Sequence, residues 1–190
     1  AGVVSGDDEE RIGRVLRRLV ALIEERSRKF NQVNASTLTQ YRQLANPDEP
    51  RVLLLIDAIG PFREQYEHVS HTPFFAMLSQ IISDGRTFGI HVIITADRPS
   101  AIPSSLASMI QRRLVMRLAS EDDYLMAGVP SGILSVNSPA GRAVMGGLEV
   151  QVGVLGGDTN AAVQARAIEQ LAERMRQSAV MPPEPVERLS

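Results

Sequence analysis

This sequence of 190 residues has no cysteine and no tryptophan, a single lysine and no long apolar run. The absence of cysteine excludes a disulfide framework, a thiolate zinc site and a thiol nucleophile, and it fits a reducing compartment. The apolar runs fall short of the ~18 residues of a membrane span, so we predict no membrane insertion by this chain. The net charge of −2 gives no sign of a polybasic patch that would by itself dictate binding to nucleic acid or membrane.

The sequence also lacks a P-loop, the glycine-rich turn that cradles nucleotide phosphates. That motif, GxxxxGK[ST], needs a lysine directly after the turn. The only lysine is Lys29, which lies in a charged amphipathic stretch predicted to be helical from about Asp8 to Phe30. We therefore predict that residues 1–190 alone do not bind ATP tightly.

Short apolar runs alternate with helical patterns along the chain, which predicts an α/β protein. RVLLLID (51–57) and GIHVIITA (89–96) are typical of strands buried on both faces, and RRLVMRL (112–118) predicts a third strand. Amphipathic stretches between them predict crossover helices of a three-layer domain with a mostly parallel sheet. Gly146 and Gly147 predict the turn of a C-terminal hairpin.

Polar residues follow two of the predicted strands, at the edge where open α/β sheets bind ligands. Asp57 ends the first strand, and a carboxylate there can hold Mg²⁺. Because an isolated aspartate at such a position can equally cap a turn, both interpretations stay open. Asp97 and Arg98 follow the second strand and are expected at the same edge. His91, inside an apolar strand, is predicted to be a hydrogen-bonded structural residue.

The stretch DGRTFGIHVIITADRPS (84–100), together with the acid-ended strand before it, resembles the FtsK/SpoIIIE motor ATPases, including EccC-type chains of type VII (ESX) secretion. The resemblance extends from Asp8 to about residue 155. It is most specific in GRxxGIHxII followed by RPS, and FREQYE (62–67) is similar to the later modules of EccC-type chains. The resemblance implies a RecA-like P-loop NTPase fold in which the P-loop strand precedes residue 1. Residues 1–178 are then the C-terminal part of one ATPase domain, and residues 179–190 are a proline-rich linker.

The resemblance also implies roles for individual residues. Asp57 matches the Walker B aspartate that positions Mg²⁺, whereas Ala58 occupies the place of the catalytic glutamate. Asp97 stands where active motors have a glutamine sensor, and Arg98 matches the arginine of that motif. Arg113 resembles an arginine that contacts nucleotide or a neighbouring subunit. Since positioning of the attacking water is worth roughly 10²–10⁴ in rate, the departures imply a degenerate site with no catalytic residue.

The function implied by the resemblance is that of a regulatory or nucleotide-binding module of a type VII secretion ATPase, with weak or no hydrolysis. The complete module would use ATP and Mg²⁺. Its implied partners are other modules of the same chain, further copies in an oligomer, and secreted helical proteins. The implied location is the cytosolic face of the membrane, through other parts of the full-length chain. A DNA-translocating module and a non-enzymatic peptide-binding module stay open as alternatives.

Overall fold

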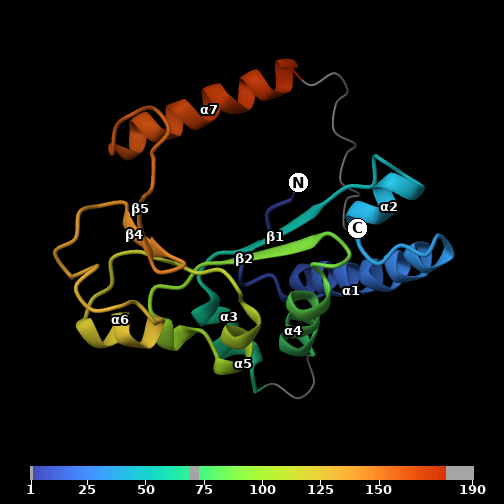
Figure 1. The fold of residues 1–190 in the computed structure, drawn as a ribbon, viewed down its shortest axis with the longest axis horizontal. Helices are drawn as coiled ribbons and strands as arrows, with labels where there is room; N and C mark the ends of the chain where they lie inside the picture. The colour runs from blue at the N-terminus through green and yellow to red at the C-terminus, as the bar shows by residue number, and fades with distance from the viewer. Residues whose placement is uncertain (1, 69–72, 179–190) are drawn as a thin grey trace. The chain divides into compact units, whose positions relative to one another are not determined.

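The computed structural model describes residues 2–68 and 73–178, which form two compact units (Figure 1). The first unit extends from Val3 to Gln111, and the second begins at Arg112. Each unit has an apolar cluster of its own. The predicted linker at 179–190 lies outside the described residues.

The first unit is an α/β structure built around two parallel strands. Val52 pairs with Ile90 and Ile56 pairs with Ile94, so the predicted strand–helix–strand crossover is confirmed. Helix α1 begins where the sequence predicted, because the Asp8 carboxylate caps it by accepting from the Arg11 amide. The elements are α1 (Glu9–Gln32), α2 (Leu38–Leu44), β1 (Val52–Ile56), α3 (Ile59–Tyr66), α4 (Phe74–Asp84), β2 (Ile90–Ile94), the 3₁₀ turn η1 (Pro99–Ala101) and α5 (Ser104–Met109).

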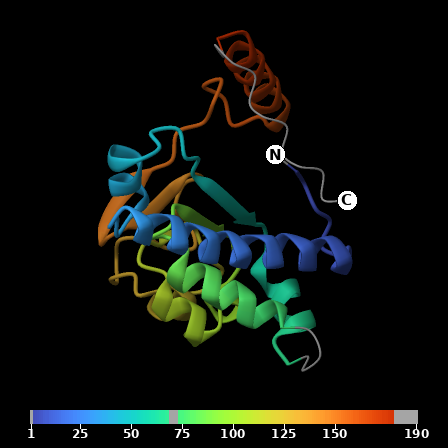
Figure 2. The ribbon, with the colours of Figure 1, turned by 90° about the vertical axis from the view of Figure 1, so that its right-hand side faces the viewer.

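Helices of the first unit cover one face of the β1–β2 sheet. Leu54 and Val92 point into the apolar cluster that the strands form with α1, α3, α4 and α5, and α1 and α4 run side by side against it (Figure 2). The alternate residues Leu53, Leu55 and Ile93 are 60%, 68% and 50% exposed. The prediction that both strands are buried on both faces is therefore wrong for the described residues, because the helices of this unit pack on a single side.

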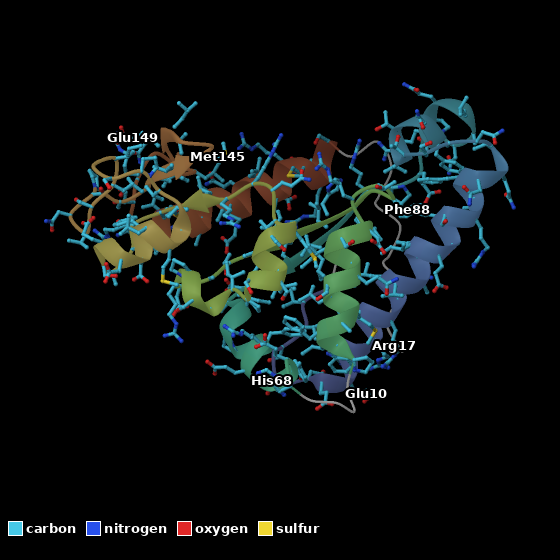
Figure 3. All side chains as sticks on the ribbon, turned by 60° about the horizontal axis from the view of Figure 1, so that its bottom comes forward. Glu10, Arg17, His68, Phe88, Met145 and Glu149 are labelled. Carbon is cyan, nitrogen blue, oxygen red and sulfur yellow. The ribbon has the colours of Figure 1, made fainter. Side chains whose placement is uncertain are left out.

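A buried arginine joins α1 to the loops that precede both strands. The side chain of Arg26 is 1% exposed, and its Nη2 lies 2.9 Å from Oε1 of Glu49. The guanidinium also donates to the backbone carbonyl oxygens of Phe88 and Pro50, each at 2.6 Å. Figure 3 labels Phe88, whose ring centroid lies 5.5 Å from that of Phe30 near the end of α1. Arg26 thus fixes where β1 and β2 begin relative to α1.

The second unit contains a three-stranded antiparallel sheet in the order β3–β4–β5. The predicted hairpin is confirmed: Gly146 and Gly147 have φ of 59° and 79°, as a two-residue type I′ turn requires. Tyr124 anchors the loops, accepting from the Leu118 amide and donating to the Ser135 carbonyl oxygen, both at 2.9 Å. The elements are β3 (Leu114–Val115), α6 (Glu121–Ala127), β4 (Arg142–Met145), β5 (Leu148–Gln151) and α7 (Ala161–Ser178).

The strand predicted at 112–118 differs from its prediction in length and in partner. It comprises only Leu114 and Val115, which pair antiparallel with Met145 and Val144 of β4. The parallel sheet therefore has two strands among the described residues, and the third predicted member belongs to the antiparallel sheet. No helix within residues 2–68 or 73–178 combines the length and the apolar character needed to cross a membrane.

Candidate functional site

The carboxylate of Asp57 lies directly after β1 and is held by a residue that follows β2. The hydroxyl of Thr95 donates to Oδ1 of Asp57 at 2.6 Å and accepts from the amide of Ala58 at 2.8 Å. The backbone of Thr95 also bonds both sides of this turn, donating to the Ile56 carbonyl oxygen and accepting from the Ile59 amide, each at 3.0 Å. Thr95 therefore fixes both the turn and one oxygen of its carboxylate.

Ala58 adopts a left-handed backbone conformation, with φ 58° and ψ 81°. A non-glycine residue pays roughly 1–2 kcal/mol for such a conformation, because its Cβ crowds the following carbonyl oxygen. The hydrogen bonds from Thr95 compensate for this strain and hold the turn from which α3 starts. The position after Asp57 thus carries a methyl group on a well-defined backbone, and no acid or base stands there.

Asp57 suits a single-ligand role toward Mg²⁺. Its Oδ2 makes no hydrogen bond with the described residues, and the side chain is exposed. Across residues 2–68 and 73–178 no group of three histidine, aspartate or glutamate side chains could hold a metal ion. Mg²⁺ commonly takes one or two carboxylates and completes its octahedron with waters and phosphate oxygens. The residues present therefore fit Mg²⁺ carried with a nucleotide, and they do not form an all-protein metal cage.

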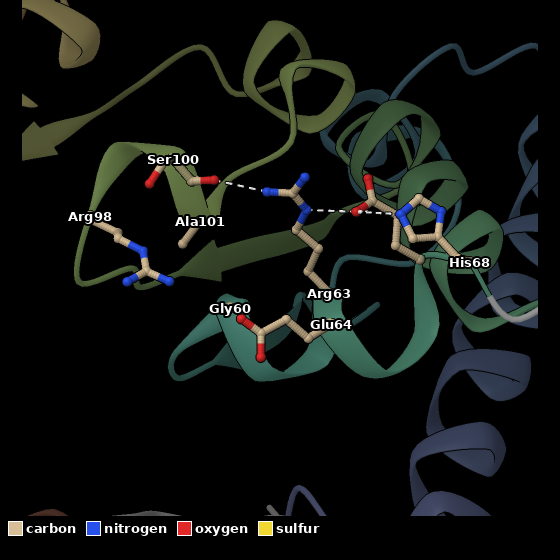
Figure 4. A pocket seen from close by; sticks show the side chains of 8 residues that line it. Gly60, Arg63, Glu64, His68, Arg98, Ser100 and Ala101 are labelled. Atoms are coloured by element: carbon tan, nitrogen blue, oxygen red, sulfur yellow. Dashed lines mark hydrogen bonds and ion pairs between the residues drawn. The ribbon is translucent and has the colours of Figure 1, made fainter.

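Arg98 lines a cavity of 580 Å³ between the segment after β2 and helix α3. Figure 4 shows Arg98 on one wall and Glu64 on another. Arg63 joins the walls, because its Nη1 donates to the Ser100 carbonyl oxygen at 2.8 Å while its Nε lies 2.6 Å from Oε2 of Glu67. The guanidinium of Arg98 has no hydrogen-bond or ion-pair partner among the described residues, so it is available to an anion.

The other predicted site residues are less closely grouped. Asp97 is exposed beside Arg98 but does not line that cavity. Arg113 belongs to the second unit, directly before β3, so its role stays a prediction. Lys29 sits in α1 with its Nζ 2.8 Å from Oε1 of Glu25, which lowers the pKa of Glu25 and raises the pKa of Lys29. This lysine is therefore a helix-surface residue, as predicted, and not a phosphate-binding one.

Sequence reasoning overlooked two residues that organise this region. The sequence does not single out Thr95, because a threonine at a strand end is common, although its place beside Asp57 follows from the parallel register. The sequence does not single out Arg63 either, because a charged residue in a polar helix is typical of a solvated face. The signal that could have found Thr95 is the pairing of two strand ends, each finishing in a polar residue.

An acid after one parallel strand and a polar residue after its neighbour form the arrangement that nucleotide-hydrolysing α/β proteins use for Mg²⁺ and the γ-phosphate. The fold and this strand edge of the chain resemble those of that class of protein. The chain belongs to the FtsK/SpoIIIE family, whose family model matches residues 3–142.

The relatives and solved structures that this chain resembles include proteins of type VII secretion systems. The chain is 28% identical over 144 residues to the type VII secretion system protein EssC of Staphylococcus aureus (strain MRSA252), covering 73% of this chain and 9% of EssC. Its fold matches EssC (ATPases 2 and 3) of Geobacillus thermodenitrificans with a TM-score of 0.77 and 21% identity, over 90% of this chain and 32% of that one. EccC (ATPases 2 and 3) of Thermomonospora curvata, in complex with a signal sequence peptide, matches with a TM-score of 0.71 and 24% identity. This match covers 94% of this chain and 33% of that one. The α/β fold of these ATPase domains is therefore confirmed for this chain.

Proposed function

We propose that this chain is part of a regulatory or nucleotide-binding module of a type VII secretion ATPase, with weak or no hydrolysis of its own. The observation that carries this proposal is the turn after β1, where Asp57 offers a free carboxylate oxygen and Ala58 offers only a methyl group. Similarity to a part of EssC supports the secretion context. Because the chain spans only 9% of EssC, the activity of a whole secretion protein is part of the proposal.

Different residues of this chain would bind the metal ion and the phosphate groups of a nucleotide. Asp57 would hold Mg²⁺ through Oδ2, since Thr95 already occupies Oδ1. Arg98 would meet phosphate oxygens, because its guanidinium is unpaired among the described residues and lines a cavity. Asp97 would oppose the approach of a γ-phosphate by like-charge repulsion. With no base at position 58, the site can bind a metal nucleotide more readily than it can activate a water.

Peptide binding by this module is a second candidate function. It is favoured by the Thermomonospora curvata relative, whose structure contains a signal sequence peptide. By this proposal, secreted helical proteins and neighbouring modules of the same or another copy are the partners, at the cytosolic face of the membrane. Nucleotide titration of the complete module, with its P-loop region, separates the two candidates, since peptide binding alone needs no nucleotide. Turnover stimulated by DNA would instead support a DNA-translocating module.

Titration of the 190-residue chain with MgATP is expected to show no micromolar binding. The chain has no P-loop sequence, and Asp57 and Arg98 alone offer few contacts to a triphosphate. Isothermal titration calorimetry measures this directly, with ATP in EDTA as the control for metal dependence. Micromolar affinity would contradict the prediction and would require a phosphate site other than a P-loop.

Replacing Ala58 with glutamate in the full-length protein is expected to raise ATP turnover by less than about tenfold, below the roughly 10²–10⁴ of a restored water-positioning group. The reason is that Asp97 still opposes the γ-phosphate. Steady-state phosphate release is the measurement, and Ala58→Gln is the matched control without the charge. A gain of about 10² or more in Ala58→Glu alone would show that Ala58 was the sole defect, and the regulatory proposal would fall.

A further inference from the structure

A second cavity, of 450 Å³, lies at the opposite end of the parallel strands from Asp57. Arg51 precedes β1 and His91 lies at the start of β2, and both side chains line it. Since each strand is five residues long, this cavity and the Asp57 carboxylate are roughly 15–20 Å apart. It is therefore separate from the site proposed for nucleotide, and nothing in the family resemblance accounts for it.

The lining of this cavity is rich in cations and contains no carboxylate. Arg51, Arg86 and His91 supply positive or protonatable groups, and hydroxyls and an amide supply further polar atoms. Arg51 and His91 make no hydrogen bond or ion pair with the described residues, while Arg86 donates to the side-chain oxygen of Gln111. The prediction that His91 is hydrogen-bonded is therefore wrong for the described residues, because its side chain lines this cavity. Two guanidinium groups thus line a cavity without a carboxylate in its lining, and an anion bound there would be attracted by both.

One acid lies close to the cavity without lining it. The hydroxyl of Ser83 donates to Oδ1 of Asp84 at 2.6 Å, so that carboxylate is engaged on its own helix. The hydroxyl of Thr87 has no hydrogen-bond partner among the described residues and can donate to a ligand. The hydroxyl oxygen of Thr37 accepts from the Gln40 amide, so its hydrogen is also left to donate.

The backbone around this cavity is closely packed, which presents its polar groups in a fixed arrangement. The Leu38 amide donates to the Thr87 carbonyl oxygen and the Val52 amide donates to the Gly89 carbonyl oxygen, each at 3.0 Å. Gly89 has φ +76°, and a Cβ there would lie 2.2 Å from Cδ2 of Leu38. The loop before β2 therefore touches α2 at a position where no side chain fits.

We propose that this cavity binds a phosphate group. A carboxylate has about four acceptor positions and is satisfied by one guanidinium fork. Here two arginines, Thr37, Thr87 and His91 line the same cavity, and together they offer more donors than a carboxylate can accept. A phosphate group has three terminal oxygens and a charge of about −1.5 to −2 at neutral pH, which matches this donor set.

The test is a titration of the 190-residue chain with inorganic phosphate, followed by amide chemical shifts in two-dimensional NMR. We expect saturable shifts at the amides of Thr87 and Gly89, with a dissociation constant on the order of 1 mM, because water competes for the charged contacts of an open site. Arg51→Gln and Arg86→Gln are each expected to weaken this binding roughly tenfold, through the loss of a charge-assisted contact.

Matched controls decide whether the effect belongs to this cavity. Arg28→Gln removes the same charge from an exposed position of α1 outside the lining and should leave the affinity unchanged. Arg51→Lys and Arg86→Lys keep the charge, so they test the site even if a glutamine variant fails to fold. Shifts that do not saturate, equal weakening in Arg28→Gln, or equal binding of acetate would each overturn the proposal.

Two further probes identify the source of the phosphate group. Glycerol 3-phosphate tests a soluble phosphomonoester, and phosphatidylcholine vesicles containing phosphatidic acid, whose headgroup is also a phosphomonoester, test a lipid headgroup by flotation. Binding of glycerol 3-phosphate that Arg51→Gln weakens supports the site with a soluble ligand. Flotation that the same variant abolishes supports it with a headgroup. If neither phosphate nor these probes respond to Arg51→Gln and Arg86→Gln, the proposal is overturned.

Discussion

Arg26→Met is expected to lower the free energy of unfolding of the first unit by about 3–5 kcal/mol, since removing one partner of a buried ion pair leaves the other charge uncompensated. The variant loses the pairing with Glu49 and the hydrogen bonds to the carbonyl oxygens of Phe88 and Pro50. Glu49 is 8% exposed, and among the described residues its carboxylate would keep only the weak contact from the side-chain amide of Asn46, at 3.4 Å. Urea denaturation followed by far-UV circular dichroism measures the loss.

Two comparisons make this prediction specific to the buried pair. Arg28→Met, at an exposed position of the same helix, should change the unfolding free energy by less than about 0.5 kcal/mol. The double variant Arg26→Met/Glu49→Met should recover part of the loss, because it removes the stranded charge as well. A cost of less than about 1 kcal/mol for Arg26→Met would mean that the pair contributes little beyond a surface salt bridge.

Gly89→Ala is expected to destabilise the first unit by about 2–5 kcal/mol, from a left-handed backbone penalty and an overpacking penalty together. Gly89 has φ +76°, and the added methyl carbon would lie 2.2 Å from Cδ2 of Leu38. Leu38 cannot move away cheaply, because it is 3% exposed and packs with Phe30, Ala35 and Tyr41. The same denaturation experiment reports the change.

Gly128→Ala separates the two contributions to that cost. Gly128 has a similar φ, +77°, but a Cβ added there would have no other atom within 4 Å, so only the backbone penalty of about 1–2 kcal/mol applies. If Gly89→Ala costs no more than Gly128→Ala, then the close approach of α2 to the loop before β2 is not a tight constraint. A larger cost shows that the glycine is required by packing as well as by conformation.

Local sequence patterns predicted the strands and the first helix of the first unit well, because the residues that specify each of these elements are close together in the sequence. The apolar runs at 51–57 and 89–96 became β1 and β2, and the charged helix began at its Asp8 cap. The hairpin of the second unit likewise followed from two adjacent glycines. Each of these depends on residues within a few positions of one another, which is the range over which periodicity, caps and turn residues act.

What could not be predicted depends on partners distant in sequence. The run at 112–118 specifies a strand, but its antiparallel pairing with β4 is set by contacts about 30 residues away. The bond from Thr95 to Asp57 spans 38 positions. Arg26 gave a signal that was overlooked: it falls between Ile23 and Phe30 on the buried side of α1, where a charge requires a partner.

The open apolar side of the β1–β2 sheet determines how the stability of this chain can be measured. Leu53, Leu55 and Ile93 present hydrophobic surface in the folded state. Fluorescent dyes such as ANS brighten on exposed apolar surface and are used to detect partly unfolded proteins. With this chain such a dye would bind the native state, giving a high starting signal and stabilising that state by mass action. Circular dichroism, which needs no added ligand, avoids both effects.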